Sequence, residues 1–324
     1  MLKNPLQKKK IFIAGHKGMV GSALVEHFKN LKIKNLILVS KKRLNLLNQQ
    51  KVNNFINKMK PDIIINCAGR VGGILANSTY PVEFLNENIL IQLSLINASY
   101  KNGIENFINL GSSCIYPKKA KQPIKENYLL SGHLEKTNEA YAIAKIVGLK
   151  SCEFYNQQLG TSYLTLMPCN LYGPNDNFNL KNSHFIPALI KKIINKKSRK
   201  NNKIEIWGSG KAKREVMHVD DLARAISFIL EKKITKNQKL LRFIKINPVI
   251  NVGSGKEFSI KKFAQMICKL SNKKENLRFN KKYPDGTMRK ILDNRIIRNL
   301  GWKPEISLEQ GLIKTIEWYK KTYL

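Results

Sequence analysis

The chain has 324 residues and a mass of 37.1 kDa, which allows one large domain or two moderate ones with a sizeable core. Apolar residues make up 43% of the chain and charged residues 25%, a mixture that excludes wholesale disorder and fibrous classes. The formal net charge is +36, which raises the question of a polyanionic partner.

This positive charge has two interpretations. It would attract nucleic acid or an anionic membrane, but it also fits compositional drift, because lysine far outnumbers arginine and both asparagine and isoleucine are abundant. The charge is spread along the chain rather than gathered in one arm, so the sequence favours drift and predicts no dedicated nucleic-acid partner. No apolar run approaches the ~18 residues of a transmembrane helix, so no membrane partner is predicted either.

The cysteines never approach CxxC spacing, which argues against a disulfide framework and against a zinc site. No other metal site is indicated. Reduced thiols are typical of the cytoplasm, which is the predicted location. The cysteines are Cys67, Cys114, Cys152, Cys169 and Cys268.

Short apolar runs alternate with longer amphipathic runs over the first half of the chain. The former predict strands and the latter helices. Because continuous apolar strands between helices indicate a parallel sheet covered on both faces, residues 11–167 predict a doubly wound, Rossmann-like α/β fold. Expected strands cover Ile11–Ala14, Leu36–Val39, Asp62–Asn66, Phe107–Leu110 and Tyr163–Met167, and expected helices cover Met19–Leu31, Val52–Met59, Val82–Tyr100 and Ala140–Leu159.

The alternation of expected strands and helices becomes less regular beyond about residue 170, where glycine, proline and asparagine cluster in Tyr172–Asp176. Short strands mixed with helices predict a smaller α+β lobe, interleaved with the end of the first domain. We therefore expect a first domain over residues 1–170 and a second lobe mainly over 171–324. Expected strands here cover Ile204–Trp207 and Val216–His218, expected helices cover Ile186–Asn195, Asp221–Leu230, Ile260–Leu270 and Leu308–Tyr319, and Lys196–Lys203 is expected to be a solvated loop.

A glycine-rich turn separates the first expected strand from the first expected helix. Its sequence, GHKGMVG over Gly15–Gly21, has GxxGxxG spacing. Gly15 permits a tight turn, Gly18 lets the backbone approach a pyrophosphate, and Gly21 lets the helix pack on the strand. The position directly after the first strand favours a dinucleotide site over a plain glycine turn.

The end of the second expected strand distinguishes NADP from NAD. An NAD site usually places a carboxylate there to hold the ribose 2′-hydroxyl. Here Ser40–Arg43, with the sequence SKKR, follows the strand, so cations replace the carboxylate. These cations, Lys41 among them, would attract a 2′-phosphate, and Lys17 adds another, so the sequence predicts NADP(H). The alternative is a solvated basic loop in a lysine-rich protein.

Tyr141 and Lys145 form a YxxxK pair on an expected helix, where the i,i+4 spacing places both side chains on one face. The ammonium is expected to lower the pKa of the phenol, and such a tyrosine can donate a proton to a carbonyl oxygen as hydride reaches the carbon. Ser112 follows the strand Phe107–Leu110, at the edge where such sheets bind ligands, and its hydroxyl could orient the same carbonyl. A YxxxK pair alone is often plain surface, so its place after a glycine-turn unit is the informative part.

The serine, the YxxxK pair and the GxxGxxG turn together resemble the extended short-chain dehydrogenase/reductase superfamily. Longer strings are similar to the GDP-L-fucose synthase family, a group of 3,5-epimerase/4-reductases, and the resemblance spans residues 10–320 or so. Those strings are GHKGMVG (Gly15–Gly21), VGGI (Val71–Ile74), GSSCIYPK (Gly111–Lys118), YAIAK (Tyr141–Lys145), MPCNLYGP (Met167–Pro174), NSH (Asn182–His184), WGSG (Trp207–Gly210) and PDGTMRK (Pro284–Lys290).

The resemblance implies an NADPH-dependent conversion of GDP-4-dehydro-6-deoxy-D-mannose to GDP-L-fucose, with cofactor on the first domain and the GDP-sugar on the second lobe. It assigns reduction to Ser112, Tyr141 and Lys145, and proton transfer in epimerisation to Cys114 and His184. The C4 carbonyl acidifies the protons on C3 and C5, so a thiolate and an imidazolium suit the inversion. Implied cofactor contacts are Gly15, His16, Lys17, Gly18, Met19, Val20, Gly21, Lys41, Leu110, Gly111, Ser112, Ser113, Lys145, Pro168, Cys169, Asn170, Leu171 and His184, and implied substrate contacts are Lys192, Trp207, Arg214 and Asp285.

Two alternatives stay open beside this hypothesis. One is another nucleotide-sugar 4-epimerase or 4-reductase, against which Lys41–Arg43, Cys114 and His184 argue. The other is a basic NADP-sensing or nucleic-acid-binding protein, against which the intact serine, tyrosine and lysine argue. The resemblance also implies a homodimer through the two long helices. Lysine stands at positions 17, 41 and 192, where the family usually carries arginine, and it keeps the charge but loses the bidentate fork.

Overall fold

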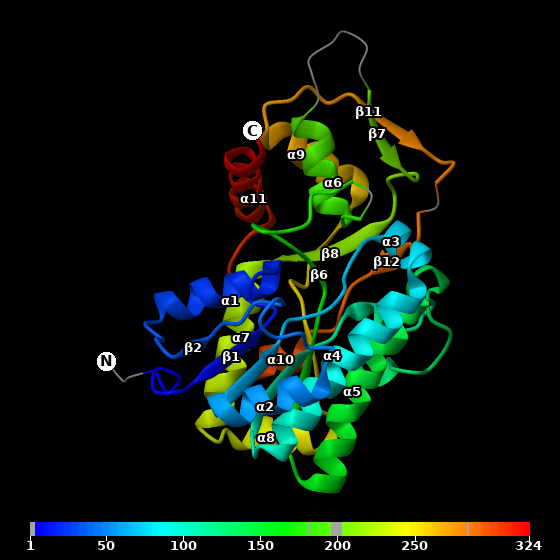
Figure 1. Cartoon of the computed structure of the whole chain (residues 1–324). Coiled ribbons are helices and arrows are strands. Elements are labelled where there is room, and N and C mark those ends of the chain that lie inside the picture. The colour runs from blue at the N-terminus through cyan, green and yellow to red at the C-terminus, as the bar shows by residue number, and fades with distance from the viewer. Residues whose placement is uncertain (1–3, 181, 196–202, 284) are drawn as a thin grey trace.

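The computed structural model describes residues 4–180, 182–195, 203–283 and 285–324. Most of the expected loop Lys196–Lys203 lies outside these residues, as does Pro284, the first residue of the PDGTMRK string. Figure 1 shows a larger lobe built round a sheet and a smaller lobe that contains the C-terminus.

The larger lobe is organised by a six-stranded sheet in the order β2-β1-β3-β4-β5-β9, in which every neighbouring pair is parallel. Its strands are buried on both faces: Ile11 and Ile13 contact one hydrophobic cluster, and Phe12 contacts another. The predicted doubly wound α/β fold is confirmed. The strands are β1 (Ile11–Ala14), β2 (Leu36–Ile37), β3 (Ile63–Asn66), β4 (Asn106–Leu110), β5 (Leu164–Pro168) and β9 (Val249–Val252).

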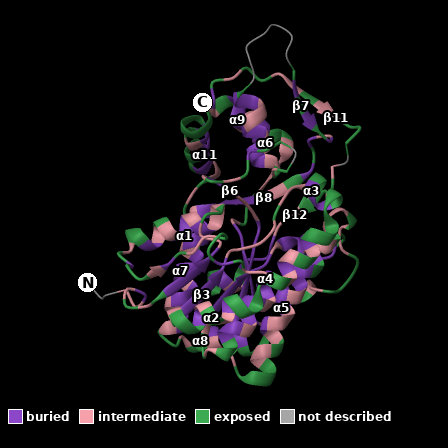
Figure 2. Ribbon diagram, viewed as in Figure 1, coloured by how far each residue is buried: buried purple, intermediate pink, exposed green. Residues whose placement is uncertain are grey.

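Helices cover both faces of this sheet. Helices α2 and α4 pack together on one face with α5 beside α4, while α1 and α7 pack together on the other (Figure 1). Figure 2 shows buried residues concentrated between these layers. The helices of this lobe are α1 (Met19–Asn30), α2 (Gln49–Met59), α4 (Pro81–Lys101), α5 (Glu139–Leu159), α7 (Val219–Ile234), α8 (Gln238–Ile246) and α10 (Arg295–Asn299).

The larger lobe takes several elements from beyond residue 170. The sixth strand, β9, was not predicted, because Val249–Val252 is a short apolar run without a repeating context. Helix α7 buries Leu222, Ile226 and Ile229 in the same hydrophobic cluster as the central strands. The second expected strand is also shorter than predicted and ends at Ile37.

The smaller lobe packs three helices against short strands. Phe178, Ile190, Phe263 and Leu312 are buried in its separate hydrophobic cluster. Strand β8 pairs with β6, β10 and β12, and β7 pairs with β11. None of the helices among the described residues is long and apolar enough to cross a membrane. The elements are α6 (Phe185–Ile194), α9 (Ile260–Leu270), α11 (Leu308–Tyr323), β6 (Asn170–Tyr172), β7 (Ile204–Trp207), β8 (Lys213–His218), β10 (Glu257–Ser259), β11 (Leu277–Asn280) and β12 (Arg289–Lys290); α3 (Ile74–Thr79) packs against α4 of the larger lobe.

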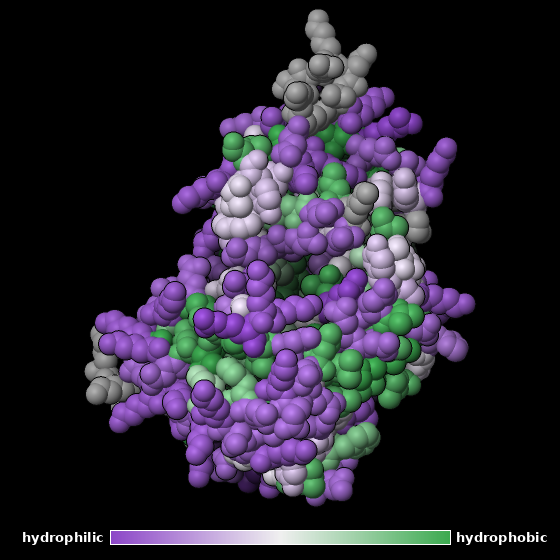
Figure 3. Space-filling view, in the orientation of Figure 1, coloured by the Kyte–Doolittle hydropathy of each residue, from purple (hydrophilic) through white to green (hydrophobic). Residues whose placement is uncertain are grey.

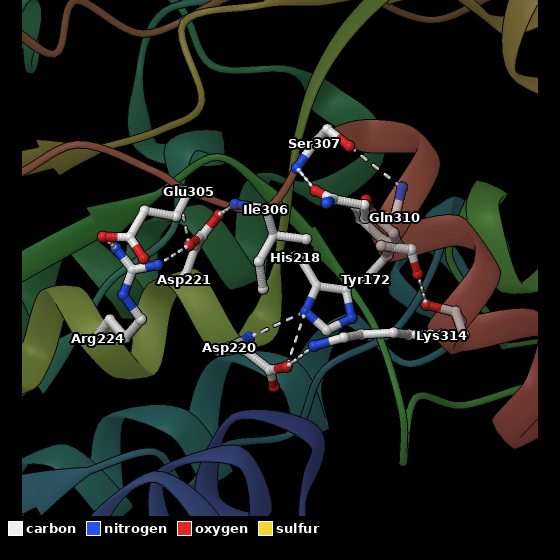
Figure 4. Close-up of polar contacts among 12 residues, drawn as sticks. Tyr172, His218, Asp220, Asp221, Arg224, Glu305, Ile306, Ser307, Gln310 and Lys314 are labelled. Carbon is white, nitrogen blue, oxygen red and sulfur yellow. Dashed lines mark hydrogen bonds and ion pairs between the residues drawn. The ribbon is translucent and has the colours of Figure 1, made fainter.

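Polar contacts fasten the start of α11 to the start of α7 (Figure 4). The buried carboxylate of Asp221 accepts hydrogen bonds from the backbone N–H groups of Glu305 and Ile306, each at 3.1 Å. On the preceding residue, the carboxylate of Asp220 lies 3.5 Å from the ammonium of Lys314. These contacts fix the place where the chain passes from one lobe to the other.

Candidate active site

The glycine turn between β1 and α1 has no room for a side chain at Gly15 or Gly21. Gly15 has a φ of +80°, and a Cβ there would lie 2.8 Å from the backbone of Ala68. A Cβ on Gly21 would lie 2.2 Å from the carbonyl oxygen of Gly15, so only glycine lets α1 pack this closely on the turn. Helix α1 follows Gly18 and has no acidic residue in its first turn, so its N-terminal N–H groups suit a phosphate.

A cleft of about 470 Å³ opens beside this turn. Its walls are the glycine turn, the loop after β2 with Lys41, and the loop after β3. These residues fit NADP, because the glycine backbone admits a pyrophosphate and Lys41 supplies a cation for the 2′-phosphate. The sequence missed Arg70 and Glu87, which pair at 2.7 Å on the same cleft. The lining residues include Gly15, His16, Lys17, Gly18, Val39, Ser40, Lys41, Cys67, Ala68, Gly69, Arg70 and Glu87.

The serine, tyrosine and lysine predicted for reduction lie together at the end of β4. The ammonium of Lys145 donates a hydrogen bond of 2.8 Å to the carbonyl oxygen of Leu110 and lies 5.7 Å from the ring centre of Tyr141. Ser112 hydrogen-bonds with the Tyr141 phenol. A Cβ on Gly111 would lie 2.3 Å from the Met167 sulfur, so a side chain at this strand end would have to displace the end of that methionine. The structure therefore brings the three side chains into one small polar cluster.

The electrostatics of this cluster differ from the prediction that the ammonium lowers the phenol pKa. Burial raises the pKa of Tyr141, and the hydrogen bond with Ser112 opposes that effect only in part. The ammonium of Lys145 is directed to the Leu110 carbonyl, and burial lowers its own pKa to about 8. Tyr141 is consequently protonated near neutral pH, which is the state required of a proton donor.

Cys114 belongs to the same cluster. It follows Ser112 in a short 3-10 turn, η1 (Ser113–Ile115), and its backbone N–H donates a 3.4 Å hydrogen bond to the Ser112 hydroxyl. Burial raises the pKa of the Cys114 thiol, while Lys290, the hydrogen bond with Ser112, and Lys145 act in the opposite direction. Lys290 belongs to the PDGTMRK string, but the sequence assigned it no role, because only the pairing of β12 with β8 brings it here.

The glycine turn, Ser112 and the Tyr141–Lys145 pair all lie within residues 11–253, which match the NAD dependent epimerase/dehydratase family. This chain belongs to that family. Its predicted resemblance to GDP-L-fucose synthases is confirmed as well, because a GDP-L-fucose synthase of Escherichia coli strain K12 is 43% identical over 318 residues. That match covers 97% of this chain and 97% of the relative.

Two solved structures match nearly the full length of the chain. A GDP-mannoheptose C4 reductase from Campylobacter jejuni, solved with NADP bound, is 36% identical with a TM-score of 0.85, and the match covers 99% of each chain. A GDP-L-fucose synthetase from Naegleria fowleri bound to NADP is 27% identical with a TM-score of 0.84, and the match covers 98% of this chain and 94% of that one.

The residues predicted to hold the GDP-sugar lie in the smaller lobe of this family member. Lys192 places its ammonium 5.0 Å from the ring centre of Trp207, beside a cleft of about 510 Å³. Tyr283, which the sequence did not single out, stacks on Trp207 with ring centres 4.3 Å apart. The guanidinium of Arg214 donates a 3.1 Å hydrogen bond to the backbone carbonyl of Asp285. Figure 3 shows a recess at the junction of the two lobes.

Strand β12 connects the two groups of predicted residues. Lys290, which lies near Cys114, is paired in register with Arg214 on β8. The predicted substrate residue Arg214 is thereby adjacent in the sheet to a cation that acts on the predicted epimerisation thiol.

His184 immediately precedes α6 as its N-cap residue, and its side chain makes no capping hydrogen bond to the helix. The residue keeps exposed surface, but the protein atoms crowded round the ring lower the imidazole pKa by desolvation. The other predicted cofactor contacts, Leu110–Ser113 and Pro168–Leu171, fall at the ends of β4 and β5. In a parallel sheet these ends share the ligand-binding edge with the glycine turn.

Proposed function

We propose that this chain converts GDP-4-dehydro-6-deoxy-D-mannose to GDP-L-fucose, by epimerisation at C3 and C5 followed by reduction at C4. The observation that carries this proposal is the placement of Cys114 within the Ser112, Tyr141 and Lys145 cluster. A reductase needs the last three residues, and the thiol adds a group that can remove a proton beside a ketone.

The reduction step follows from the protonation states in the cluster. Bound NADPH supplies the hydride that is delivered to C4. Tyr141, held protonated by burial, donates its proton to the C4 oxygen, and Ser112 orients that oxygen through its hydroxyl. Lys145, whose pKa is lowered to about 8, is largely protonated at pH 7 and stabilises the tyrosinate left behind.

The epimerisation step needs groups on both sides of the sugar ring. Protons on C3 and C5 are acidified by the C4 ketone, and the Cys114 thiolate removes one. Lys290 and Lys145 favour that thiolate. His184 comes from a different element and lobe, so it can deliver a proton to the opposite face. Inversion results because the proton leaves from one face and returns to the other.

Replacing Lys41 with glutamate is expected to weaken NADPH at least tenfold while changing the NADH affinity much less. Lys41 lines the cofactor cleft, and only NADPH carries the 2′-phosphate that this ammonium would bind. Lys42→Glu is the matched control, because Lys42 is exposed and absent from the lining of the cleft. Binding of both cofactors is measured by fluorescence titration. Equal losses of NADPH and NADH in Lys41→Glu would show that Lys41 does not face the phosphate.

We further propose that the protein is a homodimer joined through α4 and α5. Both helices expose large apolar side chains, and the space-filling view shows an apolar patch over this region (Figure 3). Such a patch on a surface helix pair is typical of an interface. The exposed residues are Val82, Leu90, Tyr100, Ile143, Phe154 and Leu159.

We propose a cytoplasmic location and no dedicated nucleic-acid partner. All five cysteines are free thiols, a state that a reducing compartment maintains. The +36 charge is spread along the chain, which favours a compositional origin. We propose that residues 1–170 bind the cofactor and that residues 171–324 mainly bind the substrate. Strand β9 and helix α7 come from the second range but pack in the core of the first domain.

Hydrogen exchange without NADPH tests the epimerase part of the proposal directly. The GDP-4-dehydro sugar is incubated in D₂O with the protein and NADP⁺, and deuterium is located by NMR. We expect incorporation at both C3 and C5. NADPH consumption in a parallel assay without any incorporation would instead favour a plain C4 reductase, the activity named for the Campylobacter jejuni neighbour.

A further inference from the structure

The loop that follows β3 is clamped by two asparagines that the proposed chemistry does not use. Asn88, which is buried, accepts a 3.0 Å hydrogen bond from the backbone N–H of Arg70 and donates one of 3.0 Å to the Arg70 carbonyl. Asn77, also buried, donates hydrogen bonds to the carbonyl oxygens of Gly72 and Gly73 at 2.8 and 3.0 Å. This double clamp fixes the backbone of residues 70–73 on the larger lobe.

The clamped loop touches the segment that carries His184. The backbone N–H of Gly73 donates a 2.9 Å hydrogen bond to the carbonyl oxygen of Asn182. A Cβ on Gly73 would lie 2.4 Å from the carbonyl oxygen of Ser183, a separation that real Cβ atoms do not adopt. Gly73 has a φ of −70°, which any residue adopts, so close approach rather than backbone strain explains the glycine.

The segment from Asn182 to His184 is held on both sides and cannot easily move away from Gly73. On one side, the N–H groups of Asn182 and Ser183 donate hydrogen bonds to the carbonyl oxygen of Asn179 at 3.0 and 2.8 Å. On the other side, α6 is anchored by Ile186 and Ile190 in the core of the smaller lobe. A displacement of Ser183 must therefore be taken up by the backbone between these two anchors, where His184 lies.

The His184 side chain makes no capping hydrogen bond to α6. The position of the imidazole therefore depends on the backbone of residues 182–184, which carries it. We propose that Gly73, held by Asn77, is a positioning residue that places the His184 imidazole for proton transfer in epimerisation. The contact joins the lobe that would hold the cofactor to the lobe that would hold the sugar. This inference rests on the proposed function.

Gly73→Ala is the direct test. The added methyl must push the Ser183 carbonyl away, and misplacement of a catalytic group by about 1 Å can cost on the order of 100-fold in rate. We expect kcat for deuterium incorporation at C3 and C5 to fall roughly 10- to 100-fold, with KM for the GDP-sugar unchanged. The reverse half-reaction, NADPH formation from GDP-L-fucose and NADP⁺, needs no inversion and should keep its initial rate.

Two further variants make the result interpretable. Gly132→Ala is the matched control, because its nearest neighbour would be a Pro117 side-chain atom at 3.5 Å, and it should leave both half-reactions unchanged. Asn77→Ala removes the clamp without adding bulk and should lower exchange in the same direction by a smaller factor. Thermal unfolding followed by circular dichroism verifies that each variant is folded.

The outcomes separate this inference from the function it rests on. Wild-type exchange rates in Gly73→Ala, or an equal fall in exchange and in NADPH formation, would overturn the positioning role. A loss confined to exchange, with the pH profile of the remaining exchange unshifted, supports it. If the unmodified protein showed no exchange at all, the proposed epimerase function would itself be refuted.

Discussion

Tyr141→Phe is expected to cut reduction at C4 by roughly 10²–10⁴-fold while leaving the fold and NADPH binding intact. Burial keeps the phenol protonated, and we propose that its proton is the one delivered to the C4 oxygen. Phenylalanine fills the same space and preserves the edge-to-face contact with Phe84, whose ring centre lies 6.0 Å away. The loss is measured as the rate of NADPH oxidation with the GDP-4-dehydro sugar.

Deuterium incorporation at C3 and C5 should survive in Tyr141→Phe, because Cys114 and His184 are proposed to move those protons. Tyr172→Phe is a suitable control, since Tyr172 is a buried tyrosine of the smaller lobe whose hydroxyl is directed to the Leu308 carbonyl. Near-normal NADPH oxidation in Tyr141→Phe would exclude this tyrosine as the proton donor.

Cys114→Ser is expected to lose exchange rather than reduction. Deuterium exchange at C3 and C5 should slow by about 100-fold or more, while NADPH binding is preserved. A free thiol has a pKa of ~8.5, whereas the alcohol of serine is a far weaker acid and supplies almost no anion near neutral pH. The variant should still reduce the unepimerised ketone slowly, which would give a 6-deoxy sugar of different configuration. NMR of the product distinguishes the two sugars.

The pH dependence of exchange gives a second measure of the same residue. Burial raises the pKa of Cys114, so the thiolate fraction, and with it the exchange rate, should rise with pH through the neutral range. That rise should be lost in Cys114→Ser. Cys152→Ser, a change of a fully buried thiol elsewhere in the larger lobe, should keep it. Formation of GDP-L-fucose by Cys114→Ser at the wild-type rate would make a plain reductase the better account.

Local sequence patterns were sufficient to predict the alternating strands and helices of the first half of the chain. The run Ile11–Ala14, the glycine turn and α1 follow from apolar pattern and glycine spacing, and the structure reproduces their bounds closely. The YxxxK pair also follows from helix periodicity. Strand β9 did not, because Val249–Val252 becomes a strand through its pairing with β5, which is distant in the sequence.

The parts of the site that the sequence missed depend on tertiary contacts. Lys290 reaches Cys114 only because β12 pairs with β8, and Tyr283 reaches Trp207 only because it follows β11 beside β7. The Tyr141 pKa was predicted in the wrong direction because spacing along a helix reveals a nearby ammonium but not the depth of burial. Gly73 carries no recognisable signal beyond the VGGI string, because its role is a contact with Ser183 on another lobe.

The most direct test of the account is the product formed from GDP-4-dehydro-6-deoxy-D-mannose and NADPH in D₂O. The proposed sequence of steps predicts stoichiometric NADPH oxidation and GDP-L-fucose as the product, with deuterium at C3 and C5 in the NMR spectrum. A reduced sugar that keeps the original configuration at C3 and C5 and carries no deuterium at either carbon would contradict it.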